Sequence, residues 1–440
     1  MAKASKQLSL SRLTVPIFIE MLLRYLSIII NTYMVTQYSN YLVGAMGAGN
    51  QIISIFFTIF SFLSVGCSIV IAQAIGAKDT VLAKKAIHQS IFFNSILGFV
   101  CGSFLFLFGD FLLNFMNIPN DLLNHSKIYL HMLAICLIFD GLGVVLAAII
   151  RVYNIVYWVM IASLIMDFVI VLLNYYMLNY TKLELFGIGL SNIIGRVTIL
   201  SILLFVFFFK LKMKLELKEL FKFEKKVMFK ILNIGSFSAG ENLIWVIQYA
   251  IALSFVASLG SLNLSVQTIY FQISMFVMLT GQAISVANEI IIGKLVGANY
   301  LSVAYKHTWR AFYFSILVTF FVVLCFYIFQ DFIMQILNLK DEFRKVMAPL
   351  FLLSIFLEVS RTFNIVMVNS LRASGDAKFP FFSACVFMLG VSLPVGYILC
   401  FWAKLGILGV WIGFLCDEFF RGLTNAFRWK SRKWQTKAIV

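Results

Sequence analysis

The stretch IAQAIGAKDTVLAKKA at residues 71–86 decides the fold, because its polar pattern returns as IGKLVGANYLSVAYKH at residues 292–307. The displacement is 221 residues, about half of the 440-residue chain. The same displacement, without gaps, relates Gly76 to Gly297, Ala77 to Ala298, Ala83 to Ala304, Lys85 to Lys306, Glu20 to Glu241, Gln51 to Gln272, Asp110 to Asp331 and Arg151 to Arg372. One displacement over this length predicts that the chain is two copies of one structural unit.

The composition excludes a soluble protein. Apolar residues make up 62% of the sequence and charged residues only 12%, whereas a soluble domain keeps roughly a quarter of its residues charged. Apolar runs of roughly 20 residues, enough to cross a bilayer, follow one another along the chain. We expect twelve spans, near 14–37, 44–75, 89–108, 128–150, 156–179, 187–209, 231–259, 264–293, 309–330, 346–370, 379–402 and 406–427. The first run is too long for a cleavable signal peptide and lacks a small-residue cleavage site.

The formal net charge of +16 is distributed unevenly over the predicted loops. With twelve spans, both termini and every second loop share one side, which carries 25 Lys and Arg against 6 on the other side. This asymmetry is typical of the positive-inside rule and predicts a multi-pass protein of the cytoplasmic (inner) membrane with both termini in the cytoplasm. The basic segments lack an aromatic-basic module, so we expect contacts with the lipid bilayer and no nucleic acid.

The number of spans in each copy determines how the copies are related. Because six is even, the second copy starts on the side of the membrane where the first starts, so the halves form parallel repeats. We expect a six-helix N-terminal lobe at 1–209, a solvated cytoplasmic linker at 210–230, and a six-helix C-terminal lobe with a basic tail at 231–440. Two similar bundles with a cleft between them suit alternating access.

Twelve ionisable residues fall inside the predicted spans, where each costs about 3 kcal/mol if it faces lipid. They are Glu20, Arg24, Asp140, Asp167, Arg196, Glu241, Glu289, Glu358, Arg361, Asp417, Glu418 and Arg421. Residues three or four apart share a helix face, which predicts the pairs Glu20–Arg24, Glu358–Arg361 and Asp417–Arg421. We expect these pairs to be structural or gating elements, with Arg24 holding Glu20 in a structural pair.

Polar residues also line single faces of three predicted spans. These faces carry Glu20, Arg24, Ser27 and Asn31; then Glu241, Trp245 and Gln248; then Gln282, Ser285 and Glu289. Glu241 has no cation within one helical turn, and an unpaired carboxyl in a span is a functional candidate by default. We therefore expect Glu241 to bind a proton, a sodium ion or a cationic compound, with Trp245 offering a cation–π surface. The alternative is that Glu241 braces a bent helix.

Several longer motifs occur in order along the two halves. The first half contains Pro16 with Glu20, MVTQYSNYLVGAMGAGNQI at 34–52 and AQAIGAKD at 72–79; the second contains SAGEN at 238–242, GKLVGA at 293–298, LRASGDAKFP at 371–380, GILGVWIGFLCDEFFRG at 406–422 and RWKSRKW at 428–434. With these motifs the chain resembles the multidrug and toxic compound extrusion (MATE) transporters over nearly its full length. The resemblance implies twelve helices in two lobes and export of amphiphilic, often cationic compounds in exchange for H+ or Na+.

One departure from the family pattern concerns the first span. Many bacterial members carry an aspartate there, in a stretch similar to Val-Asp-Thr-x-Met, whereas this chain reads Ile-Asn-Thr-Tyr-Met at 30–34. Asn31 does not titrate, so this position does not supply a proton site. Asp140 and Asp167 match nothing in the family pattern, and each is a candidate for the lost carboxylate.

These features favour an antiporter that exports amphiphilic, cationic or zwitterionic drugs or metabolites and acts as a monomer. No nucleotide-binding loop or nucleophile motif is present in the sequence, so we expect no enzyme, and no cofactor besides H+ or Na+ as coupling ion. The seven cysteines and four histidines lack metal-ligand spacing. A flippase for a lipid-linked precursor is the alternative, but it needs a cationic cavity, whereas acids outnumber bases eight to four within the spans. The duplicated halves disfavour a channel.

Overall fold

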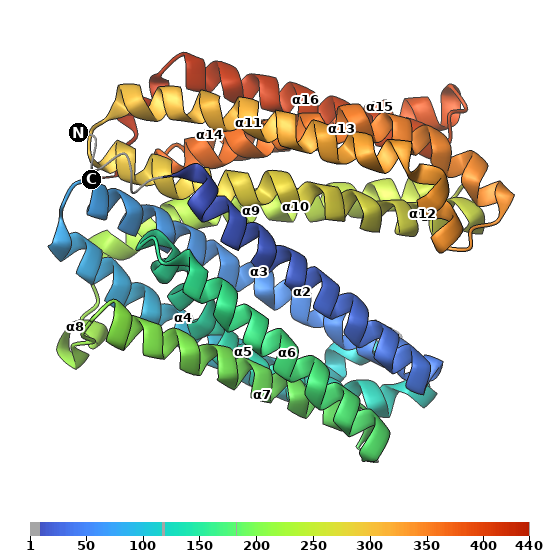
Figure 1. Cartoon of the computed structure of the whole chain (residues 1–440), viewed down its shortest axis with the longest axis horizontal. Coiled ribbons are helices and arrows are strands. Elements are labelled where there is room, and N and C mark those ends of the chain that lie inside the picture. Colours follow the sequence, from blue (N-terminus) through green and yellow to red (C-terminus); the bar gives the residue numbers. More distant parts are fainter. Residues whose placement is uncertain (1–8, 117–118, 182, 440) are drawn as a thin grey trace. The chain divides into compact units, whose positions relative to one another are not determined.

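The computed structural model describes residues 9–116, 119–181 and 183–439, and this part of the chain is helical with no strand. The start of the predicted N-terminal lobe, residues 1–8, lies outside the described residues. Twelve long helical segments follow one another (Figure 1): α2 Leu10–Tyr38, α3 Asn40–Gly76, α4 Thr80–Phe115, α5 Asn120–Val152, α6 Val156–Tyr180, α7 Glu184–Phe205, α9 Lys225–Ala257, α10 Ser261–Gly297, α11 Leu301–Ile328, α13 Asp341–Ala373, the segment Lys378–Trp402, and α16 Ile407–Lys430. The predicted twelve-helix membrane fold is confirmed.

Irregular and short elements complete the chain. The segment Lys378–Trp402 consists of α14 (Lys378–Ala384) and α15 (Leu393–Tyr397), each followed by a π-helical stretch. Two short helices, α8 (Leu217–Phe221) and α12 (Gln330–Ile336), lie between longer ones. The short helices α8 and α12 add no further crossing of the membrane, because a crossing helix needs about 20 residues.

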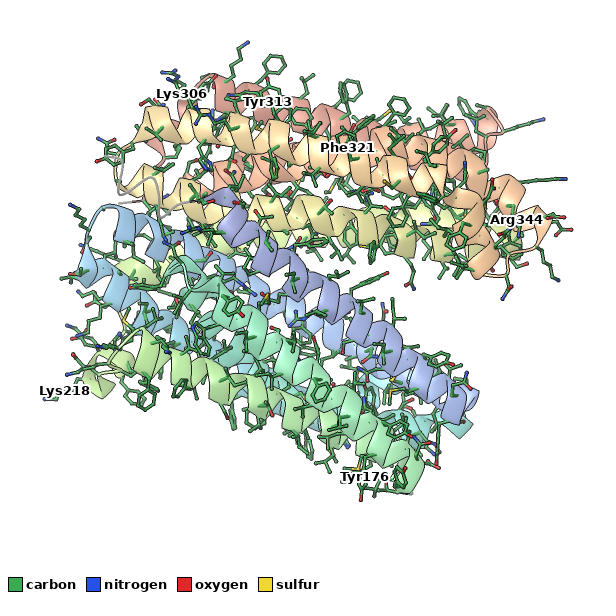
Figure 2. The ribbon with its side chains drawn as sticks, viewed as in Figure 1. Tyr176, Lys218, Lys306, Tyr313, Phe321 and Arg344 are labelled. Carbon is green, nitrogen blue, oxygen red and sulfur yellow. The ribbon has the colours of Figure 1, made fainter. Side chains whose placement is uncertain are left out.

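Within the described residues, eleven helical segments are long and apolar enough to cross a membrane. The twelfth, α16, is 24 residues long but carries Asp417, Glu418 and Arg421. All three charged side chains are buried inside the protein. Large apolar side chains such as Phe321 on α11 are exposed instead, as Figure 2 shows. α16 therefore hides its charges from lipid, as the cost of a charge in a bilayer requires.

The chain forms two compact units. As far as they are described, residues 19–71 and 79–235 form the N-unit, and residues 9–18, 72–78 and 236–439 form the C-unit. Three helices, α2, α3 and α9, pass from one unit into the other. Three of the four unit boundaries thus lie within helices, and the fourth, between residues 78 and 79, lies in the turn before α4. The predicted lobe boundaries at 209/210 and 230/231 fall within the π-helical stretch Val206–Lys210 and within α9.

The N-unit is built on close packing between α4 and α5. A Cβ atom added to Gly98 on α4 would come within 3.2 Å of the Cα atom of Gly141 on α5, so small residues permit this approach. α5 also packs on α7, and α7 on α6. The apolar core includes Phe60, Leu105 and Leu137. This packing turns the polar residues of α5, α6 and α7 toward the interior of the N-unit.

α13 is the central helix of the C-unit and packs against α10, α11 and α16. Apolar and aromatic side chains fill the core around it, and the ring of Tyr270 meets that of Trp411 edge-on, with 4.6 Å between centroids. Gly281 on α10 lies against Thr362 on α13. Because α13 is enclosed on several sides, its polar residues are buried and must find partners on neighbouring helices.

The two repeated turns of the opening motif contact each other within the C-unit. A Cβ atom at Gly76 would collide with the carbonyl oxygen of Lys294, and a Cβ atom at Gly297 would collide with the carbonyl oxygen of Gln73. Gln73 and Lys294 are themselves equivalent positions of the repeat. The ends of α3 and α10 therefore cross reciprocally, and this close approach explains why both turns keep a glycine.

The predicted linker at 210–230 packs on the first turns of α4 through two ion pairs. The ammonium of Lys84 lies 2.6 Å from a carboxylate oxygen of Glu216, and that of Lys85 lies 2.9 Å from Glu224. Hydrogen bonding to Lys84 lowers the pKa of Glu216, and hydrogen bonding to Lys85 lowers the pKa of Glu224. The acidic residues of the linker thus anchor it to the N-unit.

Candidate functional site

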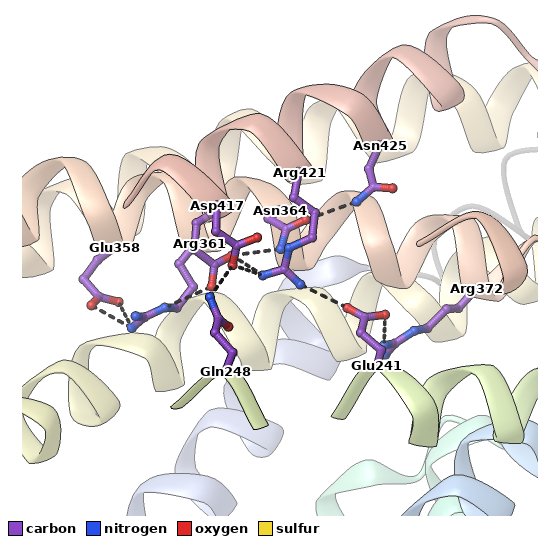
Figure 3. A network of polar contacts seen from close by, with 10 residues as sticks. Glu241, Gln248, Glu358, Arg361, Asn364, Arg372, Asp417, Arg421 and Asn425 are labelled. Carbon is purple, nitrogen blue, oxygen red and sulfur yellow. Dashed lines mark hydrogen bonds and ion pairs between the residues drawn. The ribbon is translucent and has the colours of Figure 1, made fainter. Parts of the chain in front are cut away.

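A network of buried charges joins α9, α13 and α16 in the C-unit (Figure 3). We call it the charge network; its members are Glu241, Glu358, Arg361, Arg372, Asp417, Glu418 and Arg421. Two of the pairs predicted from helical spacing form within it. A carboxylate oxygen of Glu358 lies 2.8 Å from Arg361 Nη1, and one of Asp417 lies 3.1 Å from Arg421 Nη2. Both predictions are confirmed.

Glu418 connects these two pairs. One of its oxygens lies 3.5 Å from Arg361 Nε and the other 3.0 Å from Arg421 Nη2. The side-chain amide of Asn364 donates a further hydrogen bond to Glu418 at 2.8 Å. Glu418 is among the charged residues predicted within spans, but the sequence predicts no role for it. Its position three residues before Arg421 was the available signal.

Uncharged side chains satisfy further oxygens of the charge network. The hydroxyl of Ser274 on α10 donates to Glu358 at 2.6 Å. The amide of Gln248 on α9 donates to Asp417 at 3.4 Å, so the predicted polar face of α9 reaches the network. These bonds extend the network to a fourth helix and hold the charged groups in fixed positions.

The charge network is not electrically balanced. It contains four carboxylates and only three guanidiniums, those of Arg361, Arg372 and Arg421. If every group is ionised, one negative charge therefore has no matching positive charge. An unmatched charge is expensive in the interior of a membrane protein. The arrangement therefore suits the uptake of one proton or one monovalent cation, which would cancel the excess charge.

The prediction that Glu241 lacks a cation partner is wrong. Its two carboxylate oxygens lie 2.6 Å from Arg372 Nη2 and 3.4 Å from Arg421 Nη1. Both arginines come from other helices, at sequence separations of 131 and 180 residues. The periodicity of a single helix reveals only partners within that helix, so it does not predict Arg372 or Arg421 as partners of Glu241.

The predicted pairing of Glu20 with Arg24 is also wrong. Glu20 on α2 is buried and pairs with Arg151 at the end of α5, with 2.5 Å between Glu20 Oε1 and Arg151 Nη2. Arg24 is exposed, although it lies within the electrostatic field of Glu20, Asp140 and Asp167. Glu20 is thus in an ion pair, but its partner is on a different helix.

The two arginine pairs are equivalent under the sequence repeat. Glu20 corresponds to Glu241 and Arg151 to Arg372, and each pair spans 131 residues. In each repeat, an arginine at the end of the fourth helix therefore holds a carboxylate on the first helix. The displacement of 221 residues already matched these four residues, so the repeat itself was the signal that could have paired them.

Asn31 lies where the family aspartate is expected and forms an amide pair. The side-chain nitrogen of Asn174 on α6 donates to Asn31 Oδ1 at 2.8 Å, and Asn31 Nδ2 donates to the hydroxyl of Ser27 at 3.3 Å. Two amides contact each other here, and neither carries a charge.

The two unassigned aspartates of the N-unit also lie in its interior. Asp140 on α5 pairs with Arg196 on α7 at 3.1 Å. Asp167 on α6 is buried, receives a hydrogen bond from Ser27, and lies in the field of Arg24 and Arg196. The three N-unit carboxylates thus stand against three arginines, and the charges of this unit balance only when Arg24, which is exposed, is counted with Arg151 and Arg196.

The remaining predicted site residues lie on α9 and α10. Trp245 is half-buried and stacks on Tyr249 with 5.7 Å between ring centroids, and Tyr249 in turn meets Phe271 at 4.7 Å. Glu289 on α10 is half-buried and outside the charge network as defined above. Within the described residues, no three His, Cys, Asp or Glu side chains gather in a way that could hold a metal ion.

Known proteins support one family. The family model MatE matches residues 16–176 and again residues 238–398, once for each repeat. The uncharacterized transporter YisQ of Bacillus subtilis is 30% identical over 99% of this chain and 97% of its own length. The probable multidrug resistance protein NorM of Thermotoga maritima is 22% identical over 98% of this chain and 94% of its own length.

Solved structures share the fold. A MOP superfamily transporter from Pyrococcus furiosus superposes with a TM-score of 0.90 at 18% identity, covering 96% of this chain and 95% of that chain. A crystal structure of MATE in the bent conformation gives a TM-score of 0.89 at 18% identity, covering 96% and 94%. The family model covers most of the chain in two matches that coincide with the repeat, and the full-length relative agrees. The chain therefore belongs to the MATE family of membrane transporters.

Proposed function

We propose that this protein is a secondary antiporter that exports amphiphilic cationic or zwitterionic compounds across the cytoplasmic membrane in exchange for H+ or Na+. It works as a monomer by alternating access, with both termini in the cytoplasm and with the lobes and linker at the predicted boundaries. Membership of the MATE family supports the transport activity, and relatives described as multidrug resistance proteins support the class of substrate. A flippase for a lipid-linked precursor is not favoured by these relatives.

The unbalanced charge network carries the proposal that an ion drives export. Four buried carboxylates against three guanidiniums leave one negative charge to be cancelled by a coupling ion or by a cationic substrate. An exporter is coupled when ion and substrate exclude each other from one site. The charges of the N-unit balance when the exposed Arg24 is counted, and the amide pair of Asn31 is neutral, so we assign the coupling site to the C-unit.

Glu241 is the proposed point of exchange within the network. It is the only network carboxylate contributed by α9, the helix that also carries Trp245 and that passes between the two units. A cation bound at Glu241 competes with the guanidiniums of Arg372 and Arg421 for its oxygens. The half-buried stack of Trp245, Tyr249 and Phe271 offers aromatic faces to the apolar part of a substrate.

The substitution Glu241→Gln tests the proposal, because it removes the charge while keeping the shape. A susceptibility panel in cells lacking their main exporters first identifies a transported compound. In liposomes, the variant is expected to lose at least tenfold of uphill export while retaining downhill exchange of labelled substrate. Glu342→Gln, which changes an exposed carboxylate on α13, is the matched control. Uphill export with unchanged pH and sodium dependence would move the coupling site to Asp167 or Glu289.

A further inference from the structure

The segment at residues 431–439, which we call the strap, folds back on the end of α16. The ring of Trp434 stacks on that of Trp429 with 4.0 Å between centroids and an angle of 3° between planes. Trp434 Nε1 donates a hydrogen bond to the carbonyl oxygen of Trp429 at 2.9 Å, and both side chains are fully buried. The strap is therefore held by the C-unit through a buried aromatic anchor.

Beyond this anchor, the strap meets the turn that follows α13. Gly375 in that turn has a φ of +94°, and a Cβ atom there would collide with the carbonyl oxygen of Lys437. The guanidinium of Arg428, just before the strap, pairs with Asp376 at 2.8 Å. The strap and the turn thus form one packed surface at this end of the C-unit.

Gln73, near the end of α3, inserts its side chain between these segments. Its Nε2 donates to the carbonyl oxygen of Ala373 at 2.7 Å, and its Oε1 accepts from the backbone N–H of Ile439 at 2.8 Å. The side chain is fully buried. One amide therefore ties together three segments that are far apart in the sequence: the end of α3 in the first repeat, the turn after α13, and the strap.

The two hydrogen bonds of Gln73 stabilise this region because each of them satisfies a backbone polar group, the carbonyl of Ala373 or the N–H of Ile439. If the side chain of Gln73 left this position, the carbonyl of Ala373 and the N–H of Ile439 would both lose a partner, and buried groups without partners are unfavourable. The repeat-equivalent residue is Lys294, which lacks an amide. A lysine ammonium cannot accept a hydrogen bond, so Lys294 cannot form the donor-and-acceptor pair of bonds that Gln73 forms, although both turns share the glycine crossing.

We propose that Gln73 and the strap form a latch that keeps the first-repeat turn, residues 72–78, in the C-unit. The turn leaves this unit only after both hydrogen bonds of Gln73 have broken. The latch rests on the contacts above and not on the proposed function. In an antiporter that alternates its access, it would additionally set how often this end of the molecule opens.

Hydrogen exchange of backbone amides, measured by mass spectrometry on the full chain in lipid nanodiscs, tests the latch. Ile439→Pro removes the donor N–H, and Ile439→Val is the matched control that keeps it. The reporters are the amides of Ala77 and Lys78, which bond within the turn to the carbonyls of Gln73 and Ile75. We expect exchange in residues 72–78 to become about fivefold faster in Ile439→Pro, as the loss of one such bond implies, and to stay unchanged in Ile439→Val.

Gln73→Leu removes both bonds at similar volume and is expected to accelerate exchange further than Ile439→Pro. Residues 261–275, in the first turns of α10, serve as the internal reference. If neither Ile439→Pro nor Gln73→Leu changes exchange in the turn, the latch is wrong. A rise of the same size in residues 261–275 would also overturn it, because the substitutions would then weaken the whole unit. These readouts need no substrate, so they stand apart from the transport result for Glu241→Gln.

Discussion

Glu20 and Glu241 occupy equivalent places in the two repeats but differ in how their second oxygen is held. Arg421 approaches the second oxygen of Glu241 at 3.4 Å, whereas Glu20 Oε2 is buried with no hydrogen-bond partner among the described atoms. The position that corresponds to Arg421 in the first repeat is Leu200, which cannot donate. Glu20 therefore depends on Arg151 as its only ion-pair partner within the described residues.

This dependence predicts an unequal effect of two arginine substitutions. Arg151→Gln leaves the carboxylate of Glu20 buried without its cation, so we expect a loss of about 3–5 kcal/mol in the free energy of unfolding. Chemical unfolding in detergent micelles measures it. The double variant Glu20→Gln with Arg151→Gln should recover most of the loss, and Arg24→Gln, at an exposed position, is the control. Equal losses for Arg24→Gln and Arg151→Gln would contradict the assignment of partners.

At the scale of helices, the sequence predicts the positions of the helices and the ion pairs within one helix. It does not predict ion pairs between different helices. Apolar runs located all twelve long helical segments, and spacing of three or four residues found the pairs within α13 and α16. The partners of Glu20 and Glu241 lie 131 residues away on other helices, so helical periodicity could not place them. Nor could periodicity predict that α2, α3 and α9 pass between units.

The crossing of α3 and α10 gives a prediction at the same scale. Gly297→Ala places a methyl group against the backbone of Gln73, which cannot yield as a side chain does, so we expect a loss of about 1–3 kcal/mol in stability. Gly47→Ala is the matched control, since a Cβ atom there meets nothing within 4 Å. Thermal unfolding in detergent should show a lower midpoint for Gly297→Ala alone. Similar unfolding midpoints for Gly297→Ala and Gly47→Ala would mean that α3 and α10 can move apart at their crossing without a loss of stability.

At the scale of the whole molecule, the distribution of charge distinguishes the two units. In the N-unit, the acids Glu20, Asp140 and Asp167 stand against Arg24, Arg151 and Arg196, whereas the charge network of the C-unit has one carboxylate more than it has arginines. The two repeats therefore differ in charge while they share the pair of a first-helix carboxylate with a fourth-helix arginine. Under the proposed function, the C-unit provides the coupling site.

The topology of α16 gives the prediction for the whole chain. Lys404 and Lys437 are exposed on opposite ends of this helix, so a spanning α16 places them on opposite sides of the membrane. In a background without reactive native cysteines, Lys404→Cys should react with an impermeant maleimide in intact cells. Lys437→Cys should react only after the cells are permeabilised. Labelling of both from outside would exclude α16 as a span.

The charges of α16 also bear on how the protein enters the bilayer. Asp417, Glu418 and Arg421 together disfavour insertion of an isolated helix by roughly 8–10 kcal/mol on translocon scales. Their partners outside α16 lie on α9 and α13, which leave the ribosome earlier. Insertion of α16 therefore requires α9 and α13 to be near the translocon already, because their charged side chains can then pair with those of α16. The insertion of α16 and its tertiary packing are then a single event.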